Sequence, residues 1–173
     1  AASDVYKRQS LTSITIGGSV TRMGFAAFER CTSLTSITIP DSVTSIGSSA
    51  FRECTSLTSV TIGGSVASIE LVAFDGCTSL TNIIFLGAAP ATEESAFRNV
   101  QEGATAYVYE QFANSFGGFG STWQGLLVEA VTPDSGDPRE VPDGSRAVHA
   151  GSGRVRSSLA EGRREAAGRG APG

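Results

Sequence analysis

The chain has 173 residues, an apolar share of 40% and a formal net charge of -4, values that allow one folded unit with a hydrophobic core. No window approaches the roughly 18 consecutive apolar residues of a membrane-spanning helix, and the N-terminus lacks the pattern of a secretory signal. Between residues 10 and 131, four Arg face ten Asp or Glu, a balance of 4 - 10 = -6. This charge disfavours nucleic acid as a partner.

The first nine residues stand outside the pattern that follows. Asp4 to Gln9 read DVYKRQ, the translation in one frame of a transposase end sequence common in sequencing libraries. We interpret residues 1–9 as an adapter-derived segment, with a flexible N-terminal arm as the alternative. Because the chain starts without Met and the pattern begins abruptly at Ser10, we expect the true start, any export signal or anchor, and further repeats to lie upstream.

A unit of 23 residues repeats through residues 10–100, as units 10–32, 33–55, 56–78 and 79–100. Apolar residues at a constant offset point inward and stack on their neighbours in the next coil, which predicts a solenoid. The second half of each unit supplies three such columns. The first is a valine column of Val20, Val43 and Val66, and the second is a phenylalanine column of Phe28, Phe51, Phe74 and Phe97. The third is a cysteine column of Cys31, Cys54 and Cys77, which Val100 closes.

Each unit begins with a pattern that predicts a short strand. Ser-Leu-Thr-Ser-Ile-Thr-Ile starts at Ser10, returns unchanged at residue 33, returns with Val60 for Ile at residue 56, and is degraded at residues 79–85. Its alternation and β-branched content favour a strand, and successive strands should stack in parallel. Gly-Gly or Pro-Asp then ends the strand with turn chemistry. The return leg is too short for a long helix, so we expect an extended piece near Val43–Ile46 and a helical turn near Ala50-Phe51.

The second unit, SLTSITIPDSVTSIGSSAFRECT, resembles the BspA-like class of leucine-rich repeats. The resemblance covers residues 10–100 and implies a β-rich solenoid with a parallel strand sheet on the concave face and short strands and helical turns on the return side. It also implies a recognition or adhesion protein at the cell surface or outside the cell. It names no ligand.

After Val100 the register is lost, and Ala104–Tyr109 is interpreted as a last edge strand. Residues 101–131 then form an aromatic-rich stretch that we predict to be the C-terminal cap of the solenoid, with Gly117 to Gly120 splitting any helix into two short pieces. Residues 132–173 hold few aliphatic residues and no aromatic one. We expect this tail to be disordered, and its Arg-Gly-Ala-Pro bias also fits translated sequence beyond the true reading frame.

Residues able to perform chemistry are sparse. The three cysteines follow the repeat period and form no C-x-x-C pair, so core packing is favoured over a metal or redox site, although stacked sulfurs could lie within reach of one another. The single histidine, His149, lies in the tail, which removes the base that a nucleophilic triad needs. Glu93-Glu94 is interpreted as a solvated surface pair. We therefore expect no catalytic residue, no metal and no cofactor.

The strand face offers the best candidate site. Hydroxyl residues alternate with buried apolar ones along each strand and recur in the next coil, which predicts hydroxyl ladders on the concave, ligand-binding surface of the resembled fold. The alternative is that these residues only provide solubility and strand propensity. We expect a binding module for protein or glycan ligands; the rivals are a structural spacer and an ice- or crystal-binding surface. The candidate binding residues are Thr12, Ser13, Thr15, Thr35, Ser36, Thr38, Thr58, Ser59 and Thr61.

Overall fold

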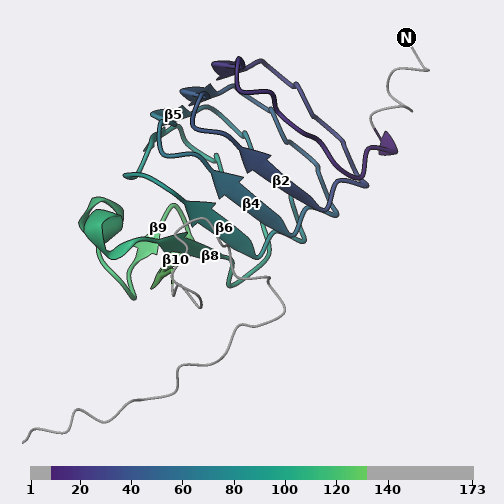
Figure 1. Cartoon of the computed structure of the whole chain (residues 1–173). Coiled ribbons are helices and arrows are strands. Elements are labelled where there is room, and N and C mark those ends of the chain that lie inside the picture. Colours follow the sequence, from purple (N-terminus) through teal and green to yellow (C-terminus); the bar gives the residue numbers. More distant parts are fainter. Residues whose placement is uncertain (1–8, 132–173) are drawn as a thin grey trace, which may run out of the picture.

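The computed structural model describes residues 9–131, which form a β-solenoid of about five turns built on two sheets of mainly parallel strands (Figure 1). The expectations for residues 1–8 and for the tail 132–173 lie outside the described residues. The large sheet has the order β2 (Ser36–Ile39), β4 (Ser59–Ile62), β6 (Asn82–Phe85), β8 (Thr105–Val108), β10 (Leu126–Ala130) and β9 (Thr122–Trp123). The small sheet, on the return side, has the order β1 (Arg22–Met23), β3 (Ser45–Ile46), β5 (Ser68–Ile69) and β7 (Ala91–Thr92).

The register follows the 23-residue period in the small sheet and from β2 to β8 in the large sheet. Ile37 pairs with Val60, and Val60 pairs with Ile83, so residues at one offset become direct neighbours in the sheet. The core between the two sheets consists of these inward columns, and the strand expected in the return leg of the second unit is confirmed as β3. Close packing also dictates glycine at Gly63, where a Cβ atom would lie 2.7 Å from the carbonyl oxygen of Pro40.

The Phe and Cys columns fill the return side of the core. Phe51 and Phe74 are fully buried, and their ring centroids lie 5.1 Å apart with an interplanar angle of 7°. Phe28 and Phe97 extend this stack at either end, at 5.4 and 5.2 Å. All three cysteines are 0% exposed, which confirms that they belong to the core.

The turns that follow the small sheet require left-handed backbone at two offsets per coil. Ala26, Ser49, Val72 and Ser95 occupy the first offset with φ of 51°, 58°, 49° and 66°. Arg30, Glu53, Gly76 and Asn99 occupy the second with φ of 59°, 59°, 75° and 55°. Backbone N–H groups beside these positions donate to carbonyls of the following coil, as Phe51 does to Ala73 at 2.8 Å. The bonds between coils therefore sustain a conformation that is costly for side chains other than glycine.

The first predicted strand is absent. Leu11 to Ile16 lie outside both sheets, and the large sheet begins at β2. Ile14 and Ile16 still pack against the core while partly exposed. β1, in the same coil, is a strand although it pairs with β3 alone, so a neighbour on one side only does not explain the difference.

The expected loss of register after Val100 is wrong. β8 pairs with β6 at the regular offset, Thr105 opposite Asn82, and continues the large sheet. β8 is also an interior strand, because β10 pairs with its other side in parallel. The apolar and β-branched residues of this segment match the inward columns even though its Leu-x-x-Ile-x-Ile pattern is gone.

The segment after β8 contains one helical piece, where two were expected. The 3-10 helix η1 (Glu110–Phe116) ends at Gly117, whose φ is 94°. The residues that follow form β9 and β10, joined by Gln124-Gly125 with φ of 52° and 82°, the two positive φ values of a type I′ hairpin turn. β10 satisfies the open backbone groups of β8, which is why the chain becomes a strand there. Trp123 packs on Phe97 at 5.9 Å and on Phe85 at 5.3 Å, while the role of residues 101–131 as a cap stays a prediction.

Candidate functional site

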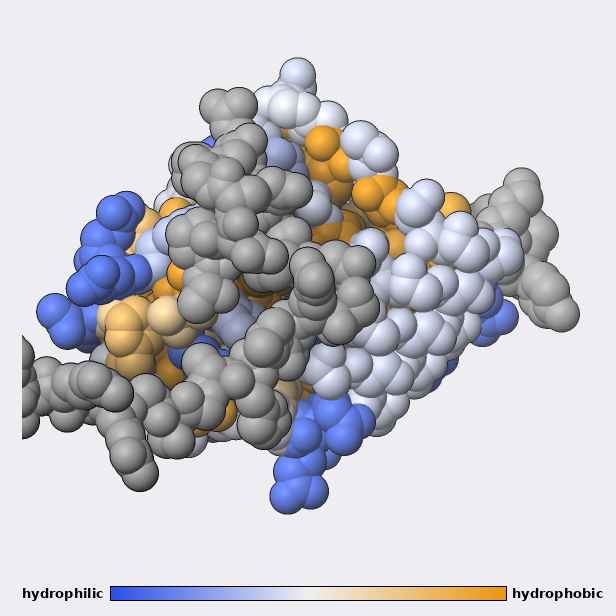
Figure 2. All heavy atoms as spheres, turned by 60° about the horizontal axis from the view of Figure 1, so that its bottom comes forward, coloured by the Kyte–Doolittle hydropathy of each residue, from blue (hydrophilic) through white to orange (hydrophobic). Residues whose placement is uncertain are grey.

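The candidate site is the outward face of the large sheet. Two outward columns cross its strands, one formed by Ser36, Ser59, Asn82 and Thr105, the other by Thr38, Thr61, Ile84 and Tyr107. None of these eight side chains is charged. In Figure 2, side chains of intermediate hydropathy cover the surface toward the N-terminal side of the molecule.

The structure places the nine predicted residues in three different environments. Thr35, Ser36, Thr38 and Thr58 are exposed and lie on or directly before β2 and β4, and Ser59 is half-buried. Thr12, Ser13 and Thr15 are exposed but lie on no strand. Thr61 is only 7% exposed, so the expectation that it faces solvent is wrong. It sits between Thr38 and Ile84 in the sheet, and neighbours on both sides cover its short side chain.

Some of the hydroxyls already have structural partners. The Thr58 hydroxyl donates to the Thr35 carbonyl at 3.0 Å, and the Thr81 hydroxyl donates to the Thr58 carbonyl at 3.3 Å. These bonds tie each coil to the one before it. The column of Thr35, Thr58 and Thr81 therefore stabilises the array, and the hydroxyls of Ser36 and Thr38 are the better ligand candidates.

The hydroxyl ladder ends toward the C-terminus. Beyond Thr61 its column continues with Ile84 and Tyr107, and Glu129 of β10 lies next to Tyr107. Burial and the nearby charge of Glu129 raise the pKa of the Tyr107 phenol, against a smaller opposing hydrogen bond with Thr105. Tyr107 thus stays a neutral hydrogen-bonding group, and the face changes from small hydroxyls to bulkier side chains along the sheet.

Charged residues gather instead on the turns beside the Phe column, in a set that we call the charge ladder: Glu29, Arg30, Arg52, Glu53, Asp75 and Arg98. Arg30 contacts Glu53 at 2.8 Å, and Arg52 contacts Glu29 at 3.3 Å. Arg98 forms two hydrogen bonds with Asp75 at 3.2 and 3.1 Å. This ladder was not predicted, although the alternating signs of Glu29, Arg52, Asp75 and Arg98 at the repeat offset are visible in the sequence.

The charge ladder holds one buried carboxylate. Asp75 is 5% exposed and also accepts from Asn99 at 2.9 Å. The hydrogen bond from Arg98, together with that from Asn99 and the charges of Arg98 and Arg52, lowers the pKa of Asp75, while burial opposes the shift. Every charge near Asp75 is engaged in a contact between coils, so this cluster is organised for stability.

The cysteine column also forms contacts between neighbouring coils, but inside the core. The Cys54 thiol donates to the Phe28 carbonyl at 3.1 Å, and the Cys77 thiol donates to the Phe51 carbonyl at 3.1 Å. A hydrogen bond with Cys31 lowers the pKa of Cys54, but the hydrogen bond with Cys77 and burial outweigh it and raise that pKa to about 12. All three side chains carry thiols rather than disulfides. Protonated, buried thiols are poor nucleophiles and poor metal ligands.

Within residues 9–131, no group of three or more His, Cys, Asp or Glu side chains is arranged to hold a metal ion. No helix of this described part is long and apolar enough to cross a membrane. His149 lies outside the described residues.

Residues 2–114 match the BspA-type leucine-rich-repeat family, in six copies. The chain belongs to this family. The BspA-type match reaches residue 114, and the pairing of β8 with β6 agrees with it, since both carry the repeat beyond Val100. A search of curated proteins found no significant match.

Solved structures of leucine-rich-repeat proteins are similar to this BspA-type chain. One from Bacteroides ovatus is 30% identical, with a TM-score of 0.42, and the match covers 66% of this chain and 30% of that protein. The T. pallidum leucine-rich-repeat protein is 20% identical, with a TM-score of 0.36 and coverage of 70% and 63%. A leucine-rich cell surface protein from Faecalibacterium prausnitzii is 21% identical, with a TM-score of 0.30 and coverage of 69% and 46%. The chain thus spans between about a third and two thirds of the length of these relatives.

Proposed function

We propose that this solenoid is a binding module for protein or glycan ligands, and that the ligand contacts the outward face of β2 and β4. One observation carries the proposal: the exposed side chains Ser36 and Thr38 form an uncharged hydroxyl surface on a rigid sheet, while the charged residues of the turns pair with one another. Rigid presentation of hydrogen-bonding groups lowers the entropic cost of binding. A location at the cell surface or outside the cell is part of this proposal and is supported by the family.

We also propose that the module binds rather than catalyses. The described residues include no histidine, and the thiols of the cysteine column are buried. Asp75 is the buried acidic side chain, and hydrogen bonds from Arg98 and Asn99 favour its ionised form. Its carboxylate is engaged in contacts between coils. An acid or base for catalysis needs a group that can exchange protons with a substrate, which the Asp75 arrangement does not offer.

A spacer without a ligand is the second candidate function. It is favoured by the hydrogen bonds of Thr58 and Thr81, because part of the hydroxyl surface is used to hold the array together. Ice or crystal binding has less support, since the Thr38-Thr61 column stops at Ile84 and Thr61 is buried.

The test is a binding screen of the full chain on an array of defined glycans and on displayed extracellular protein domains. The Ser36→Glu/Thr38→Glu double variant should lose at least about tenfold in affinity for any ligand found, because unpaired charges would be buried in the interface. The matched control is Ala67→Glu/Ala91→Glu, which adds the same charge at two exposed positions on the side of the small sheet. Loss of binding by the control variant alone would place the ligand elsewhere. A screen without any ligand would favour the spacer.

A further inference from the structure

The outward face of the large sheet changes character at its C-terminal strands. Tyr107 of β8 lies directly beside Glu129 of β10, and Thr105 lies directly beside Leu127. These four side chains point away from the core, because the alternate residues of both strands are the ones that belong to it. In place of the small hydroxyls of β2 and β4, this part of the face carries an aromatic ring, a carboxylate and an exposed apolar side chain.

The Tyr107 ring lies along the sheet instead of standing away from it. Its phenol takes part in a hydrogen bond with Thr105, two residues earlier on the same face of β8. A phenol oxygen reaches that position only when the ring runs along the strand. The 8% exposure of Thr105 agrees with this, and Tyr107 itself is half-buried. One face of the ring therefore rests on the sheet, and the other is directed outward.

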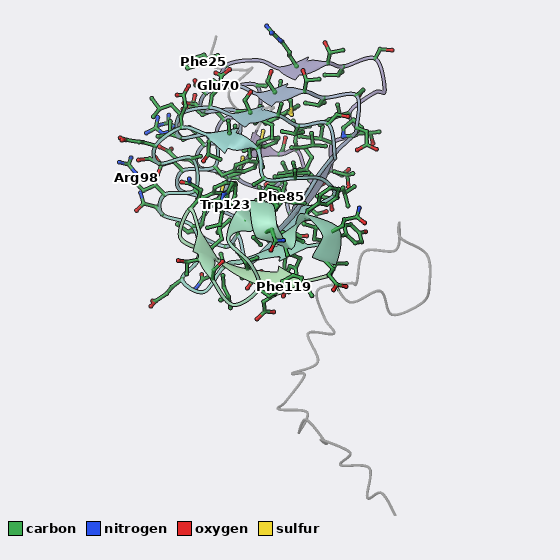
Figure 3. The ribbon with its side chains drawn as sticks, turned by 90° about the vertical axis from the view of Figure 1, so that its left-hand side faces the viewer. Phe25, Glu70, Phe85, Arg98, Phe119 and Trp123 are labelled. Carbon is green, nitrogen blue, oxygen red and sulfur yellow. The ribbon has the colours of Figure 1, made fainter. Side chains whose placement is uncertain are left out.

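Glu129 is the exposed charge next to this ring. Within residues 9–131, its carboxylate takes part in no ion pair and no hydrogen bond. Residues 99–131 contain three Glu and no Lys or Arg. The preceding arginine, Arg98, is paired with Asp75 in the charge ladder, and Figure 3 shows it on the turns at one side of the coils. The described part of the chain thus supplies no cation to the carboxylate beside the ring.

An outward aromatic face beside such a carboxylate matches a guanidinium group. The face of a tyrosine ring attracts a cation placed over it. Guanidinium is planar, so it stacks on the ring, and its forked donors pair with a carboxylate at the same time. An ammonium group has neither property, so arginine fits better than lysine. Sugar hydroxyls would also pack on the ring, but they would leave the negative charge of Glu129 without a counter-charge.

We propose that Tyr107 and Glu129 bind an arginine side chain of a protein ligand, with the guanidinium stacked on the outward ring face and paired with the carboxylate. This rests on the proposed function, because it adds a second contact on the same sheet and selects protein over glycan. β8 lies three strands from β2, about 14 Å at the usual strand spacing, and a short extended segment spans that distance. One ion pair on an open face adds only a weak salt dependence to ligand binding.

The test titrates the isotope-labelled full chain at low salt with three probes. They are an acetylated Gly-Ser-Arg-Ser-Gly amide, the same peptide with Lys in place of Arg, and methyl β-glucoside. Nuclear magnetic resonance shifts of the amides of residues 105–108 and 127–130 report binding. A single stacked and paired guanidinium gives a dissociation constant on the order of tens of millimolar, which such a titration measures. We expect saturable shifts with the Arg peptide and binding at least about threefold weaker with the Lys peptide.

Four variants locate the site. Tyr107→Leu and Glu129→Gln should each weaken binding of the Arg peptide at least about threefold. Tyr107→Phe keeps the ring and should retain most of the binding. Glu102→Gln is the matched charge control, because Glu102 is exposed and lies in the turn before β8, off the sheet. Circular dichroism of each variant checks that the solenoid is intact.

Each outcome bears on the proposal. An equal loss with Glu102→Gln would show a general charge effect and overturn the site. Equal binding of the Arg and Lys peptides, with no effect of Tyr107→Leu, would overturn stacking on the ring. Saturable shifts with the glucoside and none with the Arg peptide would assign the ring to a glycan. Shifts with no probe would overturn the arginine site, and the separate ligand screen with its Ser36 and Thr38 variants would still decide the proposed function.

Discussion

Replacing Phe51 by alanine removes the ring at the centre of the Phe column. The side chain is 0% exposed and stacks on Phe28 at 5.4 Å and on Phe74 at 5.1 Å. Truncating a buried phenylalanine costs about 3–5 kcal/mol, and each stacked aromatic pair adds about 0.5–1.5 kcal/mol beyond its buried area. We expect Phe51→Ala to lower the free energy of unfolding by about 4–6 kcal/mol, a loss that approaches the whole stability of a small domain.

Phe28→Ala is the internal comparison. Phe28 is half-buried and has one ring neighbour in the column, so its truncation should cost about 2 kcal/mol. Phe51→Leu retains most of the buried volume and should cost about 1–2 kcal/mol, mainly from the lost ring contacts. Together, the costs of the three variants separate the contribution of buried apolar area from the contribution of ring stacking.

Urea unfolding of the full chain, followed by circular dichroism and by the fluorescence of Trp123, measures these costs. Trp123 contacts Phe97 at the far end of the column, so agreement between the two signals would show that the array unfolds as a unit. A Phe51→Ala cost below about 1 kcal/mol, or one equal to that of Phe28→Ala, would refute the account of the column as a continuous buried stack.

Three further predictions concern single columns. Thiol labelling of the folded chain at pH 8 should be slow and should become fast in guanidinium, because the cysteines are 0% exposed and the pKa of Cys54 is raised to about 12; rapid labelling of all three without denaturant would contradict this burial. Val72→Gly should be more stable than Val72→Ala by about 1 kcal/mol in urea unfolding, since φ at Val72 is 49° and only glycine is unstrained there. The lowered pKa of Asp75 stabilises the fold above the ordinary carboxyl pKa near 4, and this contribution is lost as pH falls through the lower folded pKa. Asp75→Asn should therefore flatten the acid side of the stability–pH curve, and an unchanged curve would show that other carboxylates dominate.

The 23-residue period was enough to predict the internal coils. Residues such as Ile37 and Val60 have the same neighbours in every coil, so one rule about their offset places them all. The buried cysteines, the Phe column and the short return strands were predictable for the same reason.

The ends and the exposure of single site residues were not predictable in this way. Leu11 to Ile16 carry the strand pattern without being a strand, whereas β2 carries the same pattern and is a strand paired with β4. β8 is a strand without the pattern, because β6 and β10 supply its partners. Thr61 has nearly the same sequence surroundings as Thr38, yet it is buried, since a side chain in the middle of a ladder is covered by its neighbours.

The candidate face on β2 and β4 is uncharged and the charge ladder lies elsewhere, so ligand affinity and stability should depend differently on salt concentration. The charge ladder stabilises the contacts between coils through exposed and half-exposed pairs such as Arg30 with Glu53, and salt weakens such pairs. The outward columns of β2 and β4 contain no charge, so a ligand that binds there by hydrogen bonds should lose little affinity when salt rises from 0.05 to about 0.5 M. Stability should fall over the same range, and the two effects can be measured on one sample by calorimetric binding and thermal unfolding. A ligand whose affinity falls steeply with salt would instead contact the charge ladder, and the large sheet would then not be its binding surface.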